Sequence, residues 1–99
     1  MHQAGVRFVA GRDAGISRFL AHGSLYDDVA FYVESGASTG QAVAAATSLA
    51  ADACTVGGRK GKIRRGHDAD ILAVDGNLEG DITGLSRVRA VLLAGIKVR

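Results

Sequence analysis

The chain has 99 residues, enough for one small domain but too few for a complete (β/α)8 barrel, which needs roughly 250 residues. Its single cysteine excludes an intramolecular disulfide and a cysteine-based zinc site, and an aromatic content of 5% argues against a stacking platform for single-stranded nucleic acid. The net charge of +2 does not indicate an acidic partner, and no stretch predicts a membrane span, so we expect a cytoplasmic protein.

The first predicted element is a short buried strand over residues 6–10, which ends at Gly11. Asp13 follows, between Gly11 and Gly15. Because α/β enzymes present catalytic carboxylates just beyond the carboxyl end of a strand, Asp13 is a candidate catalytic residue. An aspartate that caps a turn between two glycines is the alternative. The segment after it is predicted to be a loop, and it contains His22.

Two helices are predicted next. The first begins at Ser24, whose hydroxyl can accept an N–H of the first turn, and ends at Gly36. The second begins at Ser38, which has the spacing of a capping box with Gln41, and continues to about Ala53. Its many alanines favour a helix by propensity alone and suit close packing against a neighbour.

The second half of the sequence has a different character. Cys54 is expected to be a small buried hydrophobic residue. The run 59–65 contains five cations, which could bind phosphates. We favour the alternative that this run is an exposed turn whose charges are solvated. Asp68 and Asp70 are expected in a turn rather than at a metal.

The elements predicted after them are a buried strand at 71–74, a turn at 75–77, a helical turn at 81–86, a strand at 88–93 and a tight turn at 94–95 into 96–98. The chain is therefore predicted to be α+β, with one segment at 1–55 and a β-rich one at 56–99.

A series of short motifs runs in order along nearly the whole chain. These are Gly-Arg-Asp-Ala-Gly at 11–15, His-Gly-Ser-Leu at 22–25, Glu-Ser-Gly-Ala-Ser at 34–38, Ala-Ala-Thr-Ser-Leu-Ala-Ala at 45–51, Gly-Lys-Ile at 61–63, Gly-His-Asp-Ala-Asp-Ile-Leu at 66–72 and the stretch 88–95. In this order they resemble the C-terminal part of the metal-dependent amidohydrolase superfamily, near its imidazolonepropionase and prolidase-like branch.

The resemblance implies a fold and a site. It implies that residues 6–10 and the two helices correspond to the last strand and helices of a (β/α)8 barrel, and that residues 56–99 form part of a small β-sandwich. It implies that Asp13 binds a divalent metal ion, expected to be zinc, and takes a proton from the attacking water. His22 would contact a small-molecule substrate, with a surface-loop histidine as the alternative. The family usually has threonine where this chain has Arg12, whose cation would disfavour a metal ion if it faces the site.

The ligand set in this chain is incomplete. The family takes its other metal ligands from earlier barrel strands, whereas His2, His22 and His67 lack useful ligand spacing, and a catalytic zinc needs about three protein ligands. Metal-dependent hydrolysis of amide or cyclic amide C–N bonds is therefore expected only if missing barrel strands complete the chain. The alternative is a non-catalytic oligomerisation or interaction domain. Either way, open strand edges predict a homo-oligomer or a complementing barrel fragment as partner, and neither nucleic acid nor a membrane.

Overall fold

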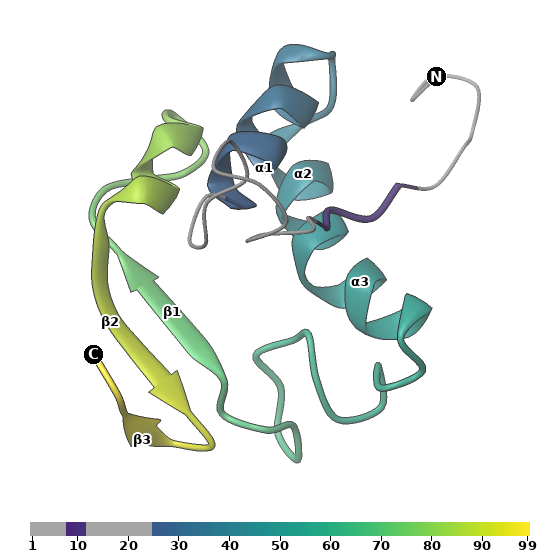
Figure 1. The fold of residues 1–99 in the computed structure, drawn as a ribbon, viewed down its shortest axis with the longest axis vertical. Helices are drawn as coiled ribbons and strands as arrows, with labels where there is room; N and C mark the ends of the chain where they lie inside the picture. Colours follow the sequence, from purple (N-terminus) through teal and green to yellow (C-terminus); the bar gives the residue numbers. More distant parts are fainter. Residues whose placement is uncertain (1–7, 12–24) are drawn as a thin grey trace, which may run out of the picture.

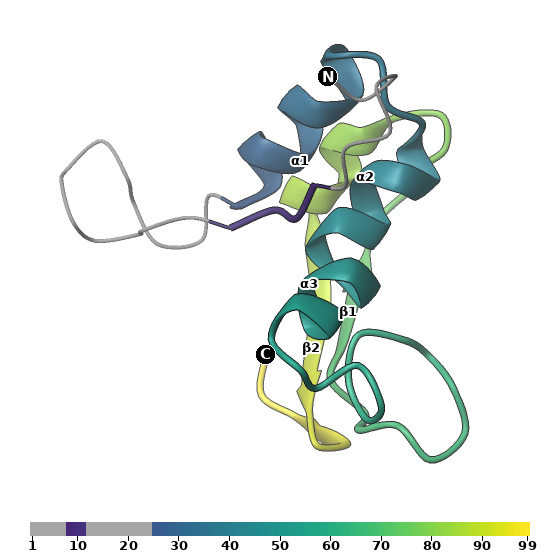
Figure 2. The same cartoon turned by 90° about the vertical axis from the view of Figure 1, so that its right-hand side faces the viewer.

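The computed structural model describes residues 8–11 and 25–99. Within these ranges, three α-helices precede an antiparallel sheet of three strands, with a short 3-10 helix between its first two strands. The elements are α1 (Leu25–Glu34), α2 (Thr39–Ala46), α3 (Ser48–Ala53), β1 (Ile71–Val74), the 3-10 helix η2 (Ile82–Ser86), β2 (Val88–Leu93) and β3 (Ile96–Lys97). The helices lie beside the sheet, and the loop 54–70 joins the two at one end (Figure 1; Figure 2). The predicted α+β class is confirmed.

Helix α1 ends where the sequence predicts, at a glycine. Gly36 has a φ of 109°. This backbone conformation costs glycine little free energy because glycine has no Cβ. Its N–H donates to the Val33 carbonyl at 3.0 Å, and the Ala37 N–H donates to the Tyr32 carbonyl at 3.3 Å. These two bonds satisfy carbonyls of the last turn, which otherwise have no partner within the helix.

The second predicted helix is in fact two helices. Its start is confirmed, because the Ser38 hydroxyl accepts the Gln41 N–H at 3.1 Å and the Gln41 side chain accepts the Ser38 N–H at 2.8 Å. The prediction of one continuous helix to Ala53 is wrong, because the backbone leaves the helical region at Thr47, with φ −125° and ψ −91°. Intrinsic propensity gives little sign of this break, since a β-branched residue is only mildly unfavourable in a helix.

The prediction of a strand at residues 6–10 also has to be corrected. Its described part, residues 8–10, forms no strand. The Ala10 N–H instead donates to the Ala45 carbonyl of α2 at 2.8 Å. A strand needs a neighbouring strand to supply ladder bonds, and the sheet in the described part of the chain is built from residues 71–97 only. The segment therefore bonds to a helix.

The sheet has the strand order β1-β2-β3, with both pairs antiparallel and Ile71 opposite Leu92. The predicted tight turn into β3 is confirmed, since Ala94 and Gly95 both have positive φ, 51° and 80°, as a two-residue hairpin turn requires. The predicted ranges of β1 and β2 are also confirmed. However, β1 is not a buried strand, because Leu72 is 50% exposed.

The closely packed interior lies around the helices. Its buried apolar residues are Val29, Ala37, Ala42, Ala45 and Ala51. Because four of the five are alanines, helix backbones approach closely while each residue buries little apolar area. Cys54, which we expected to be buried, is exposed at the end of α3, where the chain turns away from the helices. In the described ranges, no helix is long and apolar enough to cross a membrane.

Candidate functional site

Both predicted site residues, Asp13 and His22, lie outside the described residues, as does Arg12. The described structure reaches Gly11 on one side of them and Leu25 on the other. It shows how the chain is held just before this interval, at residues 8–11, and where it continues as α1.

Two contacts hold residues 8–11 against the helices. The Phe8 ring lies against the Tyr32 ring of α1, with centroids 5.6 Å apart and planes tilted by 56°, a favourable aromatic arrangement. The Ala10 N–H donates to the Ala45 carbonyl of α2. One contact uses a side chain and the other uses the backbone, so the path of the chain up to Gly11 is set from two helices. Neither contact was predicted from the sequence.

A cavity of about 320 Å³ lies between this segment and α1. Its walls combine apolar side chains with three polar ones, and the lining is Phe8, Val9, Ala10, Gly11, Asp28, Phe31, Tyr32, Ser35 and Ala45. The Ser35 hydroxyl donates to the Phe31 carbonyl at 2.9 Å, and Phe31 itself is 68% exposed. Such a surface suits an apolar group of a partner or ligand with one or two polar atoms.

The described residues do not form a metal site. Among them, no group of three or more histidine, cysteine, aspartate or glutamate side chains is placed to hold an ion. His67, the histidine within these ranges, has its Nε2 3.3 Å from the Gly57 carbonyl oxygen, so its ring is engaged with the backbone. The described residues therefore do not by themselves assemble a metal centre, and a site at Asp13 would need ligands from outside the described ranges.

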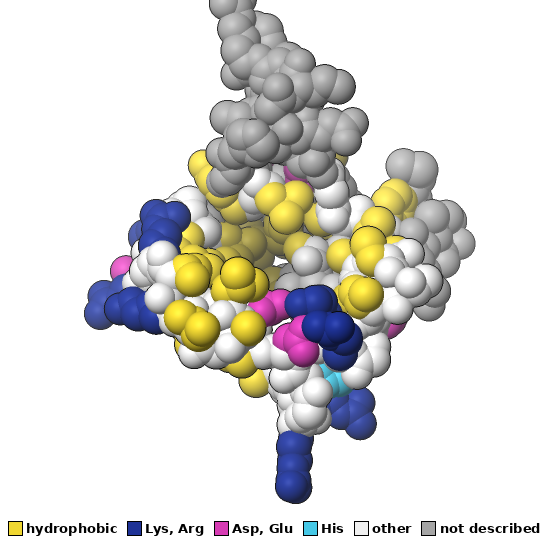
Figure 3. Space-filling model, turned by 60° about the horizontal axis from the view of Figure 1, so that its bottom comes forward, with side chains coloured by type: hydrophobic (Ala, Val, Ile, Leu, Met, Phe, Trp, Pro, Cys, Tyr) yellow, Lys and Arg dark blue, Asp and Glu magenta, His cyan; other side chains and the backbone are white. Residues whose placement is uncertain are grey.

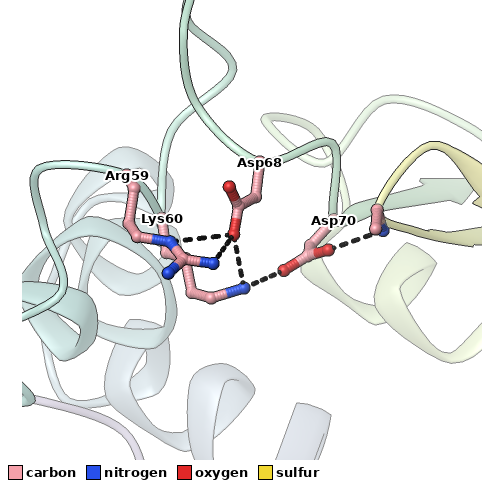
Figure 4. Close-up of polar contacts among 5 residues, drawn as sticks. Arg59, Lys60, Asp68 and Asp70 are labelled. Carbon is pink, nitrogen blue, oxygen red and sulfur yellow. Dashed lines mark hydrogen bonds and ion pairs between the residues drawn. The ribbon is translucent and has the colours of Figure 1, made fainter.

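A cluster of four charged side chains closes the loop 54–70 (Figure 4). Asp68 Oδ2 accepts from Arg59 Nη2 at 2.7 Å and lies 2.9 Å from Lys60 Nζ, which also donates to Asp70 Oδ2 at 2.7 Å. The other Asp70 oxygen accepts the Ala94 N–H at 2.9 Å. The cluster therefore joins the loop to the turn between β2 and β3.

The electrostatics of the cluster favour its charged form. Hydrogen bonds from Arg59 and then Lys60 hold the pKa of Asp68 below its ordinary value, and bonds from Lys60 and the Ala94 N–H lower the pKa of Asp70. Hydrogen bonds to Asp70 and Asp68 raise the pKa of Lys60. The predicted solvated turn is thus partly wrong: two of its five cations are neutralised within the loop. The signal was available in the sequence as two acids placed nine and ten residues after two bases.

A hollow opens beside this cluster (Figure 3). It is a cavity of about 570 Å³ between the helices and the sheet, with Lys60 and Asp70 at one side and apolar walls that include Val43, Leu72 and Leu85. With neutralised charges at its rim, the hollow offers apolar surface rather than catalytic groups.

Comparison with known proteins places the chain in a family. A sequence profile of the amidohydrolase family matches residues 1–98. The chain belongs to the amidohydrolase family. The resemblance to the metal-dependent amidohydrolase superfamily, which the motifs indicated, is therefore confirmed. A search of curated protein sequences gives no match.

Solved structures resemble the amidohydrolase chain over almost its whole length. A Xaa-Pro dipeptidase with methionine bound in its active site is 31% identical, with a TM-score of 0.90 over 99% of this chain and 23% of that one. A putative prolidase from Bifidobacterium longum is 28% identical, with a TM-score of 0.91 over 98% of this chain and 24% of that one. Molinate hydrolase is 25% identical, with a TM-score of 0.88 over 97% of this chain and 24% of that one. The chain thus spans about a quarter of the length of these structures.

Proposed function

We propose that this chain is the C-terminal part of a metal-dependent hydrolase of amide C–N bonds, and that it acts when the missing barrel strands complete it. The supporting observation is the extent of the structural match. Nearly all of the chain corresponds to about one quarter of a Xaa-Pro dipeptidase and of a putative prolidase, with TM-scores of 0.90 and 0.91. The other three quarters of such an enzyme have no counterpart in these 99 residues.

In the complete enzyme, residues 6–10 would form the last barrel strand and residues 56–99 part of a small sandwich. The described part of this segment bonds to the Ala45 carbonyl and has no strand beside it within the described ranges. A neighbouring barrel strand would supply the ladder bonds that a strand requires. This proposal accounts for a strand-like sequence whose described part, residues 8–10, forms no strand.

The chemistry that we assign to this chain is carried by Asp13. A divalent ion, with zinc expected, lowers the pKa of bound water in hydrolases of this kind. Asp13 would help to hold the ion and accept a proton from the attacking water, and His22 would contact the substrate. Since two of the similar structures are a Xaa-Pro dipeptidase and a putative prolidase, Xaa-Pro dipeptides are the first substrates to test.

A complementation experiment tests this function. The Bifidobacterium longum prolidase without its matching segment is refolded with the 99-residue chain and zinc, and release of proline from a Xaa-Pro dipeptide is followed. We expect hydrolysis by the mixture, reduced about 10²- to 10⁴-fold by Asp13→Asn and unchanged by the matched control Asp27→Asn. Calorimetric titration with zinc should show the same difference between the two variants.

Two results would contradict the proposal. One is a stable complex that binds zinc but hydrolyses no dipeptide or related amide. The other is equal hydrolysis by wild type and Asp13→Asn, which would remove Asp13 from the site while leaving the family membership intact.

A second candidate is a non-catalytic interaction domain that associates with a second copy of itself. It is favoured by the exposed aliphatic side chains of the sheet, with Leu93 58% and Ile96 69% exposed. Sedimentation of the chain at increasing concentration measures this directly. A monomer throughout would exclude the homo-oligomer.

A further inference from the structure

Thr47 interrupts the helix by an exchange of hydrogen bonds. In a continuous helix, the Val43 carbonyl would accept the N–H of Thr47, four residues further on. Here the Thr47 hydroxyl donates to the Val43 carbonyl at 2.7 Å, and the Thr47 N–H donates to the Ala44 carbonyl at 3.2 Å. The Thr47 side chain thus donates to the Val43 carbonyl in place of the Thr47 backbone N–H. A threonine stabilises a bend in a helix in this way.

The break changes what the Ala45 carbonyl can bind. In a continuous helix, this carbonyl would accept the N–H of Leu49. That bond requires helical dihedral angles at Thr47, which lies between the two residues and has φ −125° and ψ −91°. The Ala45 carbonyl accepts the Ala10 N–H instead, at 2.8 Å, on a residue that is only 1% exposed. A buried carbonyl needs a partner, and the N-terminal segment provides it.

The loop 54–70 also packs against this break. A Cβ placed at Gly61 would lie 2.8 Å from the Thr47 carbonyl oxygen and 3.0 Å from Ser48 Cα. The backbone of the loop therefore touches the helix at the interruption itself. This contact fits a break that is a fixed part of the fold.

We propose that Thr47 is a positioning residue for the segment that leads to Asp13. Its hydroxyl maintains the break, the break makes the Ala45 carbonyl available, and that carbonyl fixes the backbone at Ala10, three residues before Asp13. The importance of this for catalysis rests on the proposed function, whereas the anchoring itself does not. Thr47 lies 37 positions from Ala10 in the sequence, so no local pattern connects them.

Hydrogen exchange of single amides tests the anchor in the 99-residue chain. Thr47→Val removes the hydroxyl and keeps the shape, while Thr47→Ser keeps the hydroxyl and serves as the matched control. We expect the Ala10 amide to be protected in wild type and in Thr47→Ser, and to exchange at least about tenfold faster in Thr47→Val. The Gly95 amide, which donates to the Ala69 carbonyl at 2.9 Å, is the internal reference and should not change.

The proposal is overturned if Ala10 is as protected in Thr47→Val as in wild type while Gly95 stays protected. It is also overturned if the wild-type Ala10 amide exchanges like a fully exposed amide, a result that needs no variant to fold. In the complemented Bifidobacterium longum enzyme, Thr47→Val should lower kcat, and Thr47→Ser should keep it near the wild-type value. Absence of hydrolysis in the wild-type mixture would count against the proposed function, but it would leave the exchange result standing.

Discussion

The helical region and the sheet region of this chain are held together in different ways. The helices pack through small side chains, and the buried apolar residues among residues 25–53 are one valine and four alanines. The sheet instead leaves Leu72, Leu93 and Ile96 at the surface and is tied to the loop 54–70 by a cluster of exposed charges. Close packing tolerates little change in side-chain volume. Exposed ion pairs contribute little to the free energy of folding, and salt weakens them. The two regions should therefore respond to different perturbations.

The largest effect is expected where the loop 54–70 packs against the helices, at Gly61. Gly61→Ala places a Cβ 2.7 Å from the Ala51 Cβ and forces alanine into a φ of 91°. We expect it to lower the free energy of unfolding by about 2–4 kcal/mol, from backbone strain and overpacking together. Denaturant unfolding measures this.

Gly66→Ala is the matched control for Gly61. Gly66 has a similar φ of 86° but nothing within 4 Å of an added Cβ, so about 1–2 kcal/mol of strain is expected there without a clash. Equal losses in the two variants would show that the loop does not press against α3.

A smaller effect is expected inside the helical region. Ala42 is 0% exposed, and Ala42→Leu adds volume where helix backbones approach closely. We expect a loss of about 1–3 kcal/mol, compared with a change within about 0.5 kcal/mol for Ala53→Leu at an exposed position of α3. A gain in stability from Ala42→Leu, measured by thermal unfolding, would indicate that this interior is underpacked.

The smallest effect is expected from the charged cluster, and it should depend on pH. The pKa values of Asp68 and Asp70 are lowered in the folded chain, so their contribution is present above the unfolded value of about 3.9 and is lost as pH falls through the folded values. The melting temperature of wild type should therefore fall more steeply below about pH 4 than that of the double variant Asp68→Asn/Asp70→Asn.

Salt sharpens this last test, because added electrolyte screens exposed ion pairs. High salt should reduce the difference between wild type and the double variant at neutral pH. The melting temperature of the double variant should still fall somewhat at acid pH, because hydrogen bonds from Thr83 lower the pKa of Asp81 as well. Glu79→Gln is the matched control, and a change as large as that of the double variant would argue against a specific cluster.

Features set by local backbone chemistry could be predicted from the sequence. The capping box at Ser38 and Gln41, the helix end at Gly36 and the hairpin turn at Ala94 each follow from a residue type with a local preference, and the structure confirms them. The strand ranges 71–74 and 88–93 follow from short apolar runs bounded by turn residues, and these are confirmed as well.

Features that depend on distant parts of the chain could not be predicted. The break at Thr47 occurs together with the Ala10–Ala45 hydrogen bond and with the close approach of Gly61, and no periodicity in residues 38–53 reveals either contact. The burial of β1 and of Cys54 was overestimated, because apolar composition does not say what covers a surface. The site predictions for Asp13 and His22 lie outside the described residues and stay predictions, as does the boundary near residues 55–58.

The two acids that flank β1 have a consequence for colloidal behaviour. In the described part of the chain, β1 pairs only with β2, so its other edge presents unpaired backbone groups beside the apolar run Ile71–Val74. Asp70 and Asp75 stand immediately before and after this run, and charges in such positions oppose the stacking of identical strands from separate molecules. Replacing both acids with asparagine should therefore lower the concentration at which the chain begins to aggregate, which light scattering would detect.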